Sequence, residues 1–150
     1  MKKGFIWICF LFLSIGGAFM QEFHDADIGD LTVSLNVTKL KRSISAVINI
    51  TNIKDYDIFI PKWNIDGVDV TNDWFVITNQ KKKIATYKGV MVKRPPPTME
   101  QCIKLIPKQS LSFEVDLSKY YSFPWFSDLL NITYDGPLGE SNTVIIHLKE

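Results

Sequence analysis

The chain has 150 residues, two cysteines and almost balanced charges, with a formal net charge of +1. This length predicts one ordinary domain, and the charge balance excludes a general electrostatic attraction to nucleic acid or to anionic membranes. A disulfide-rich secreted scaffold is excluded as well, because Cys9 lies in an amino-terminal leader and only Cys102 remains outside it.

The first 18 residues have the features of a cleavable export signal. Lys2 and Lys3 precede an apolar run over residues 5–15. Residues 16–18 (Gly-Gly-Ala) are small, and cleavage after Ala18 requires small residues at these positions. A membrane anchor is the alternative, but the run is shorter than the ~20 residues that span a bilayer. We therefore predict a signal peptide over 1–18, an acidic lead-in over 19–30 and one domain over 31–150. A secreted or periplasmic location follows, without stable membrane insertion after cleavage.

Apolar residues alternate with polar ones along most of the remaining chain. Every second residue is apolar in 31–37, 44–50, 111–117 and 144–148, which is the period of a half-buried strand. The polar link 39–43 joins the first two runs into a predicted hairpin. Shorter strands are predicted at 58–61, 74–78, 83–87, 102–106 and 130–134.

No stretch after the leader keeps the apolar spacing of a helix over three turns, and Pro124 limits residues 118–130 to one helical turn. About eight short strands separated by turns indicate an all-β protein. The expected architecture is an immunoglobulin-like antiparallel β-sandwich.

The sequence lacks the residue patterns of common enzymes and metal sites. It has neither the His-Glu-x-x-His of zinc peptidases nor the Gly-x-Ser-x-Gly of serine hydrolases. His24 lies in the lead-in, His147 has the outward phase of the last strand, and we interpret Cys102 as a buried apolar residue. Three aspartates between positions 66 and 73 match no calcium loop, so we interpret them as turn residues. We expect a non-enzymatic protein without a cofactor or metal.

The most unusual segment covers residues 87–97. Three apolar residues precede a basic pair, and three prolines then stiffen the chain. A stiff segment loses little conformational entropy on binding. The alternative is an edge strand over 90–92 whose pairing the prolines block. The candidate partner-binding residues are Val90, Met91, Val92, Lys93 and Arg94.

Short motifs follow one another in a fixed order through this part of the chain. They are Ile60-Pro-Lys-Trp-Asn64, Trp74-Phe-Val-Ile77, Tyr87-Lys-Gly89, Lys93-Arg94, Pro97, Ile103-x-Leu105, Pro107, Ser110, Val115-Asp-Leu-Ser118 and Tyr120-Tyr121. In order and spacing the series resembles the N-terminal β-sandwich domain of deuterolysin-like and peptidyl-Lys metalloendopeptidases. The resemblance covers roughly residues 31–148.

That resemblance implies a propeptide-like domain, which in the family helps the following zinc peptidase to fold and keeps it latent. Because this chain carries no zinc-binding helix motif, it implies an exported binding protein that inhibits or chaperones a secreted zinc metallopeptidase in trans. The alternative is a carbohydrate- or cell-envelope-binding module with an aromatic platform. The candidate platform residues, which are also typical of a core, are Trp63, Trp74, Tyr120, Tyr121, Trp125 and Phe126.

Overall fold

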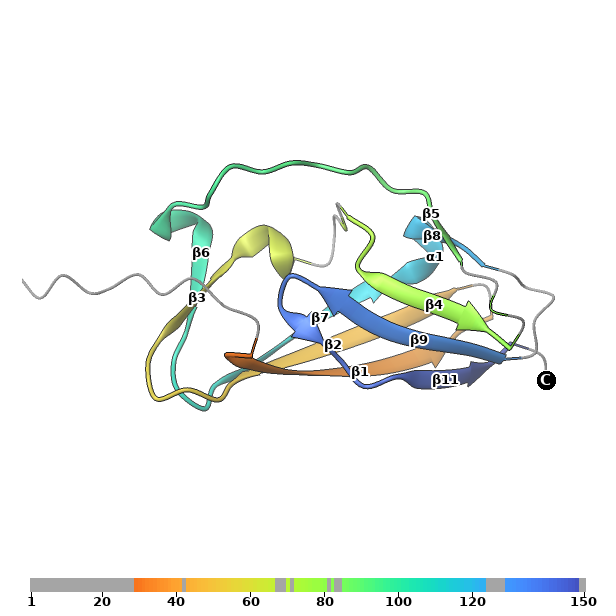
Figure 1. The fold of residues 1–150 in the computed structure, drawn as a ribbon, viewed down its shortest axis with the longest axis horizontal. Helices are drawn as coiled ribbons and strands as arrows, with labels where there is room; N and C mark the ends of the chain where they lie inside the picture. Colours follow the sequence, from red (N-terminus) through yellow and green to blue (C-terminus); the bar gives the residue numbers. More distant parts are fainter. Residues whose placement is uncertain are drawn as a thin grey trace, which may run out of the picture.

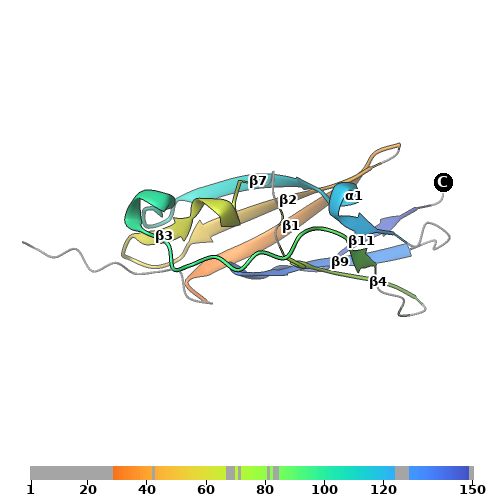
Figure 2. The same ribbon diagram turned by 90° about the horizontal axis from the view of Figure 1, so that it is seen from above.

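Antiparallel strands make up most of the structure. The computed structural model describes residues 29–41, 43–66, 70, 72–80, 82, 85–123 and 129–148, so the predicted signal peptide and most of the lead-in lie outside the described residues. Two sheets face each other, as the two views in Figures 1 and 2 show. The all-β sandwich expected from the alternating sequence is therefore confirmed.

The first sheet is built on a long hairpin. β1 (Leu31–Lys39) and β2 (Ile44–Asn52) pair antiparallel along their whole length, and β7 (Ser110–Asp116) pairs with the other side of β2. The Leu40 N–H donates to the Ser43 carbonyl at 2.8 Å and closes the turn. The period of two is regular here because one face of the sheet is buried and the other meets solvent.

The second sheet is centred on β9 (Leu129–Gly136). β4 (Phe75–Asn79) pairs with one side of β9. β11 (Val144–His147) and the two-residue β10 (Gly139–Glu140) pair with its other side. All of these pairings are antiparallel, so short turns suffice to connect neighbouring strands.

The core lies between the two sheets and is crossed by aromatic contacts. The Tyr134 ring lies edge-on to Phe75, with centroids 5.5 Å apart, and edge-on to Phe113 at 6.5 Å. Phe113 and Tyr134 belong to opposite sheets, so this contact joins the layers. Burying each large apolar side chain stabilises the fold by about 1.5–3 kcal/mol. Fully buried aliphatic residues come from both sheets: Ile44, Ile48, Ile50, Ile77, Leu130 and Ile132.

On one side of the sandwich, the Asn142 side chain bonds to the backbone of β1 with the two hydrogen bonds that a neighbouring strand would make. The Asn142 amide accepts from the Leu35 N–H at 2.8 Å and donates to the Leu35 carbonyl at 3.2 Å. Lys39 adds a bond from its Nζ to the Leu148 carbonyl at 2.6 Å. These bonds connect β1 to the segment around β11, which lies beside it in Figure 1.

Beyond a corner, the β2–β7 ladder continues as a second pair, β3 (Ile58–Pro61) and β6 (Cys102–Leu105). The corner is fixed by Asn52, whose buried amide donates to the Tyr56 and Leu105 carbonyls at 2.8 and 2.9 Å. A 3-10 turn lies at the outer end of each strand. These are η1 (Lys62–Asn64) after β3 and η2 (Met99–Gln101) before β6.

The opposite side of the sandwich, between β7 and β4, is covered by elements outside the two sheets. α1 (Leu117–Tyr120) and the two-residue strands β5 (Thr86–Tyr87) and β8 (Tyr121–Ser122) lie at one end. From there the segment 88–98 runs along the molecule to η2 (Figures 1 and 2). This segment contains most of the candidate site.

Eight of the nine predicted strands correspond to described strands of four residues or more, and the two-residue strands β8 and β10 were not predicted. Eight described strands have four residues or more, and three two-residue strands complete the set. The expected strand over 83–87 is present only as β5, and residues 83–84 lie outside the described part. In the part of the chain that the structure describes, no helix has both the length and the apolar character to cross a membrane.

The prediction of strand at Leu117 is wrong. Leu117 keeps the apolar phase of β7 but begins α1, because the Asp116 carboxylate accepts from the Ser118 N–H at 3.0 Å. A side-chain acceptor at this position satisfies a free backbone donor and starts a helical turn. Leu117 is still fully buried, so the same apolar side chain serves either conformation.

Candidate functional site

The segment 88–98, which we call the strap, lies in no helix or strand. It leaves β5 at one end of the sandwich and reaches η2 at the other (Figures 1 and 2). The alternative expectation, an edge strand over 90–92, is therefore wrong. A segment without ladder hydrogen bonds needs other contacts to hold it in place.

The strap is fixed at its first end by Tyr87. The Tyr87 hydroxyl donates to the Val70 carbonyl at 2.6 Å and shares this proton with the Val90 carbonyl at 3.1 Å. Burial, and then the charge of Asp73, raises the pKa of Tyr87 above its usual value. The adjacent Lys88 N–H donates to the Tyr120 carbonyl at 2.7 Å. These bonds tie the strap to the sandwich just before its exposed residues.

Gly89 is needed beneath the Tyr87 ring. A Cβ atom at Gly89 would lie 2.2 Å from the Tyr87 hydroxyl oxygen. The same arrangement recurs in β9, where a Cβ at Gly136 would lie 2.4 Å from the Tyr134 Cζ. In both Tyr-x-Gly sequences the tyrosine ring therefore lies across the glycine two residues later. The ring can approach the backbone this closely because glycine has no Cβ atom.

The other end of the strap is fixed at η2. The Thr98 N–H donates to the Gln101 side-chain oxygen at 3.0 Å, and the Gln101 N–H donates to the Thr98 carbonyl at 3.0 Å. Lys62 of η1 donates from Nζ to the Glu100 carbonyl at 2.7 Å. The strap is thus held at both ends.

The candidate residues divide between two sides of the strap. Val90 and Met91 are 72% and 73% exposed, and Lys93 is exposed beside them. Val92, which is half-buried, and Arg94, which is exposed like the others, line a pocket between the strap and the sandwich. The sequence grouped these five residues as one contact, and the structure divides them into three that lie outside the pocket lining and two that belong to it.

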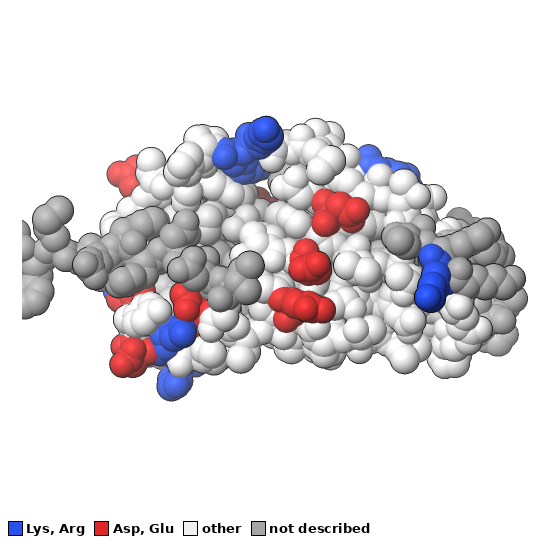
Figure 3. All heavy atoms as spheres, viewed as in Figure 1, with Lys and Arg blue, Asp and Glu red and all other residues white. Residues whose placement is uncertain are grey.

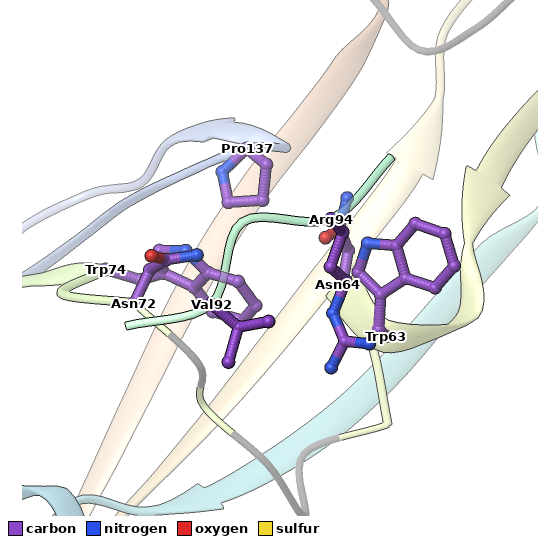
Figure 4. A pocket seen from close by; sticks show the side chains of 7 residues that line it. All are labelled: Trp63, Asn64, Asn72, Trp74, Val92, Arg94 and Pro137. Carbon is purple, nitrogen blue, oxygen red and sulfur yellow. The ribbon is translucent and has the colours of Figure 1, made fainter. Parts of the chain in front are cut away.

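The pocket has a volume of about 140 Å³. Figure 4 shows Trp74, Asn72 and Val92 on one side of it, facing Trp63, Asn64 and Arg94, with Pro137 at the rim. The Arg94 guanidinium lies over the Trp63 ring, 5.2 Å from its centroid. The lining thus combines two indole rings, two primary amides and one permanent cation.

The wall that carries Trp74 is held by Tyr121. The fully buried Tyr121 hydroxyl accepts from the Phe75 N–H at 3.0 Å and donates to an Asp73 carboxylate oxygen at 2.9 Å. Burial, followed by the hydrogen bond to Asp73, holds the pKa of Tyr121 well above its usual value. The Tyr121 ring also packs against Tyr87 at 5.4 Å, so the wall and the base of the strap share one aromatic contact.

The electrostatic character of the strap is basic. Its charged residues are Lys88, Lys93 and Arg94, and no acidic residue lies between positions 88 and 98. In Figure 3 basic side chains lie along the upper rim, where the strap runs, an acidic group lies at the left end of this rim, and further acidic groups lie in the middle of the same face. A partner that meets the rim therefore encounters apolar side chains next to positive charge.

Of the other residues considered from the sequence, Trp63 and Trp74 line the pocket, and the structure groups none of the remaining described ones with them. Trp74 and Tyr121 are buried, whereas Trp63 and Tyr120 are half-buried; Trp125 and Phe126 lie outside the described residues. Cys102 is buried and His147 is exposed, as their strand positions predict. Among the described residues, no three His, Cys, Asp or Glu side chains are grouped as metal ligands.

The sequence predicted the outer residues of the strap but not the pocket. The pocket is lined by residues that meet only through the fold, at positions 63, 64, 72, 74, 92, 94 and 137. The paired sequences Trp63-Asn64 and Asn72-Asp73-Trp74 were the one available signal, since each places an indole near an amide.

Comparisons with known proteins assign no family to the chain. No family model matches it, and no curated protein is significantly similar to it.

Proposed function

We propose that the chain is an exported, non-catalytic binding protein that contacts a protein partner through the outer residues of the strap. The observation that carries this proposal is the pair Val90 and Met91, which are 72% and 73% exposed on a segment held at both ends. Adjacent exposed apolar side chains on a soluble surface are typical of interaction sites.

The fixed ends make such a contact favourable. Binding by a loose loop costs free energy because the loop must become ordered, whereas a segment already held by Tyr87 and by η2 has less freedom to lose. Met91 is a flexible apolar residue suited to an adaptable contact. Lys93 beside it favours a partner with an acidic rim and raises the association rate more than the final affinity.

For the partner we propose a secreted or periplasmic zinc metallopeptidase. The support is the resemblance of the motif series to propeptide domains of such enzymes, together with the predicted export signal. The strap would occlude the peptidase cleft, and Arg94-Pro95 is a poor scissile bond because proline restricts the backbone on both sides.

Inhibition assays test this function. The purified protein should slow at least one member of a panel of deuterolysin-like zinc peptidases, and Met91→Asp should weaken inhibition by about tenfold or more, because a charge replaces a central apolar contact. Met99→Asp is the matched control, since Met99 is also exposed but lies in η2. An unchanged rate across the panel would refute the peptidase partner.

The alternative of a carbohydrate-binding module receives less support from the described residues. Sugar platforms present several exposed rings, whereas Trp74 and Tyr121 are buried and contribute to the core. We therefore place the contact on the strap.

A further inference from the structure

We propose that the pocket beneath the strap receives one acidic side chain of the protein partner, with its carboxylate held by Arg94 and the amides of Asn64 and Asn72. This proposal rests on the proposed function, because the acidic residue belongs to the protein that the strap contacts.

The size of the pocket limits its occupant to one side chain. Its volume is about 140 Å³, close to the ~150 Å³ cavity that accepts one benzene molecule. Pockets for drug-sized ligands are larger, at about 300–1,000 Å³. The stem and carboxylate of one glutamate are therefore of suitable size.

The structure gives the polar side chains that line the pocket no hydrogen-bond or ion-pair partner among the described residues. Arg94 lies over Trp63 but forms no ion pair with a described residue, and the Asn64 and Asn72 side chains form no hydrogen bond to one. A guanidinium stacked on a ring keeps its edge N–H groups free, and this edge matches the two oxygens of a carboxylate. Because an ionised carboxylate only accepts hydrogen bonds, it suits this set of donors.

The remaining lining suits the aliphatic stem of a glutamate. Trp74, Val92 and Pro137 form apolar surface next to the donors (Figure 4). Asp73 lies between the lining residues Asn72 and Trp74, and its carboxylate accepts from the Tyr121 hydroxyl at 2.9 Å. Asp73 therefore has a partner of its own, and Arg94 remains available to a carboxylate from outside.

Arg94 and Met91 lie three residues apart on the same strap. One partner surface can therefore place an apolar patch on Val90 and Met91 while an acidic side chain enters the pocket. This pairing of apolar contact with charge recognition supplies specificity, because a partner that lacks the acidic residue leaves the Arg94 charge unpaired at the interface.

The experiment is an NMR titration of the ¹⁵N-labelled protein with two small probes. N-acetyl-glutamate N-methylamide carries the carboxylate, and N-acetyl-glutamine N-methylamide is its neutral match. The indole N–H signals of Trp63 and Trp74, assigned through Trp63→Phe and Trp74→Phe, report occupancy. We expect saturable shifts with the glutamate probe in the millimolar range and none with the glutamine probe.

Two variants with the same change of charge locate the binding. Arg94→Gln should weaken binding of the glutamate probe by about tenfold or more. Lys93→Gln does not alter the lining of the pocket, so it should change the affinity for this probe by less than about twofold. Asn64→Asp places a negative charge in the lining and should abolish the shifts. Equal effects of Arg94→Gln and Lys93→Gln would overturn the proposal, as would equal shifts with both probes or no shift at all.

Further outcomes separate this proposal from the proposed function. Met91→Asp should weaken partner binding but leave the probe titration unchanged. If Met91→Asp weakens partner binding while the glutamate probe never binds, the pocket proposal fails and the strap function stands. If methyl glucoside shifts the indole signals and the glutamate probe does not, the pocket takes a neutral sugar and the carboxylate proposal is overturned.

Discussion

The ring of Tyr87 lies over Gly89 so closely that a Cβ atom at Gly89 would stand 2.2 Å from the Tyr87 hydroxyl oxygen. That hydroxyl is bonded to the Val70 carbonyl, and the ring packs on Tyr121. The ring therefore cannot move away without losing these contacts, and the direction of the strap depends on a glycine at this position.

Gly89→Ala should displace the Tyr87 ring and destabilise the protein by about 1–3 kcal/mol, the usual cost of inserting an atom into a packed site. Urea unfolding measures the change. Lys88→Ala, an exposed neighbour, should shift the free energy of unfolding by less than about 0.5 kcal/mol. In a Tyr87→Ala background the Gly89→Ala change should cost little, because the clashing ring is gone. If Gly89→Ala lowered the free energy of unfolding equally in that background, the close contact between Gly89 and the Tyr87 ring would be contradicted.

Tyr121 and Tyr134 should respond differently to loss of the hydroxyl. Tyr121→Phe leaves the buried Phe75 N–H without its acceptor and should cost about 1–3 kcal/mol. The buried Tyr134 hydroxyl forms no hydrogen bond with the residues described, so Tyr134→Phe should be neutral or slightly stabilising. Thermal or urea unfolding of the two variants checks this, and equal losses would contradict the assigned bonds.

Alkaline pH should destabilise the fold through these same two tyrosines. Burial is the main cause that raises their pKa values in the folded state, so they stay protonated where an unfolded tyrosine ionises. This stabilisation is present below pH about 10 and is lost as the pH rises above it, at up to about 1.4 kcal/mol per pH unit for each group. Urea unfolding between neutral pH and pH about 11 should show the decline. In a Tyr121→Phe, Tyr134→Phe double variant the decline should be smaller, and an unchanged slope would contradict the assignment.

The sheets were predictable wherever one face of a strand is polar. β1 and β2 repeat this pattern without interruption, so alternation alone placed them and the hairpin between them. The boundary at Leu117 was not predictable in this way. A buried Leu fits either continued strand or α1, and the Asp116 side chain decides between them.

The pocket and the Asn142–Leu35 hydrogen bonds could not be predicted from the sequence, because both depend on contacts between distant residues. Asn142 reaches Leu35 across 107 positions, and no local pattern distinguishes it from other polar residues near β11. Arg94 was recognised as part of a basic pair, but its place over Trp63 depends on where the strap crosses η1. Composition indicated that the segment is stiff, and only the fold shows which of its residues are exposed and which line the pocket.

The central claim is that the outer residues of the strap bind a protein. The most direct measurement uses the wild-type protein, Met91→Asp and Ile145→Asp as baits in quantitative affinity capture from the producing cell's periplasm and medium. Ile145 is 61% exposed on β11 and serves as the matched apolar control. A partner enriched equally by the wild type and Ile145→Asp, but about tenfold less by Met91→Asp, is the predicted result. Equal enrichment of every partner by all three baits would contradict the claim.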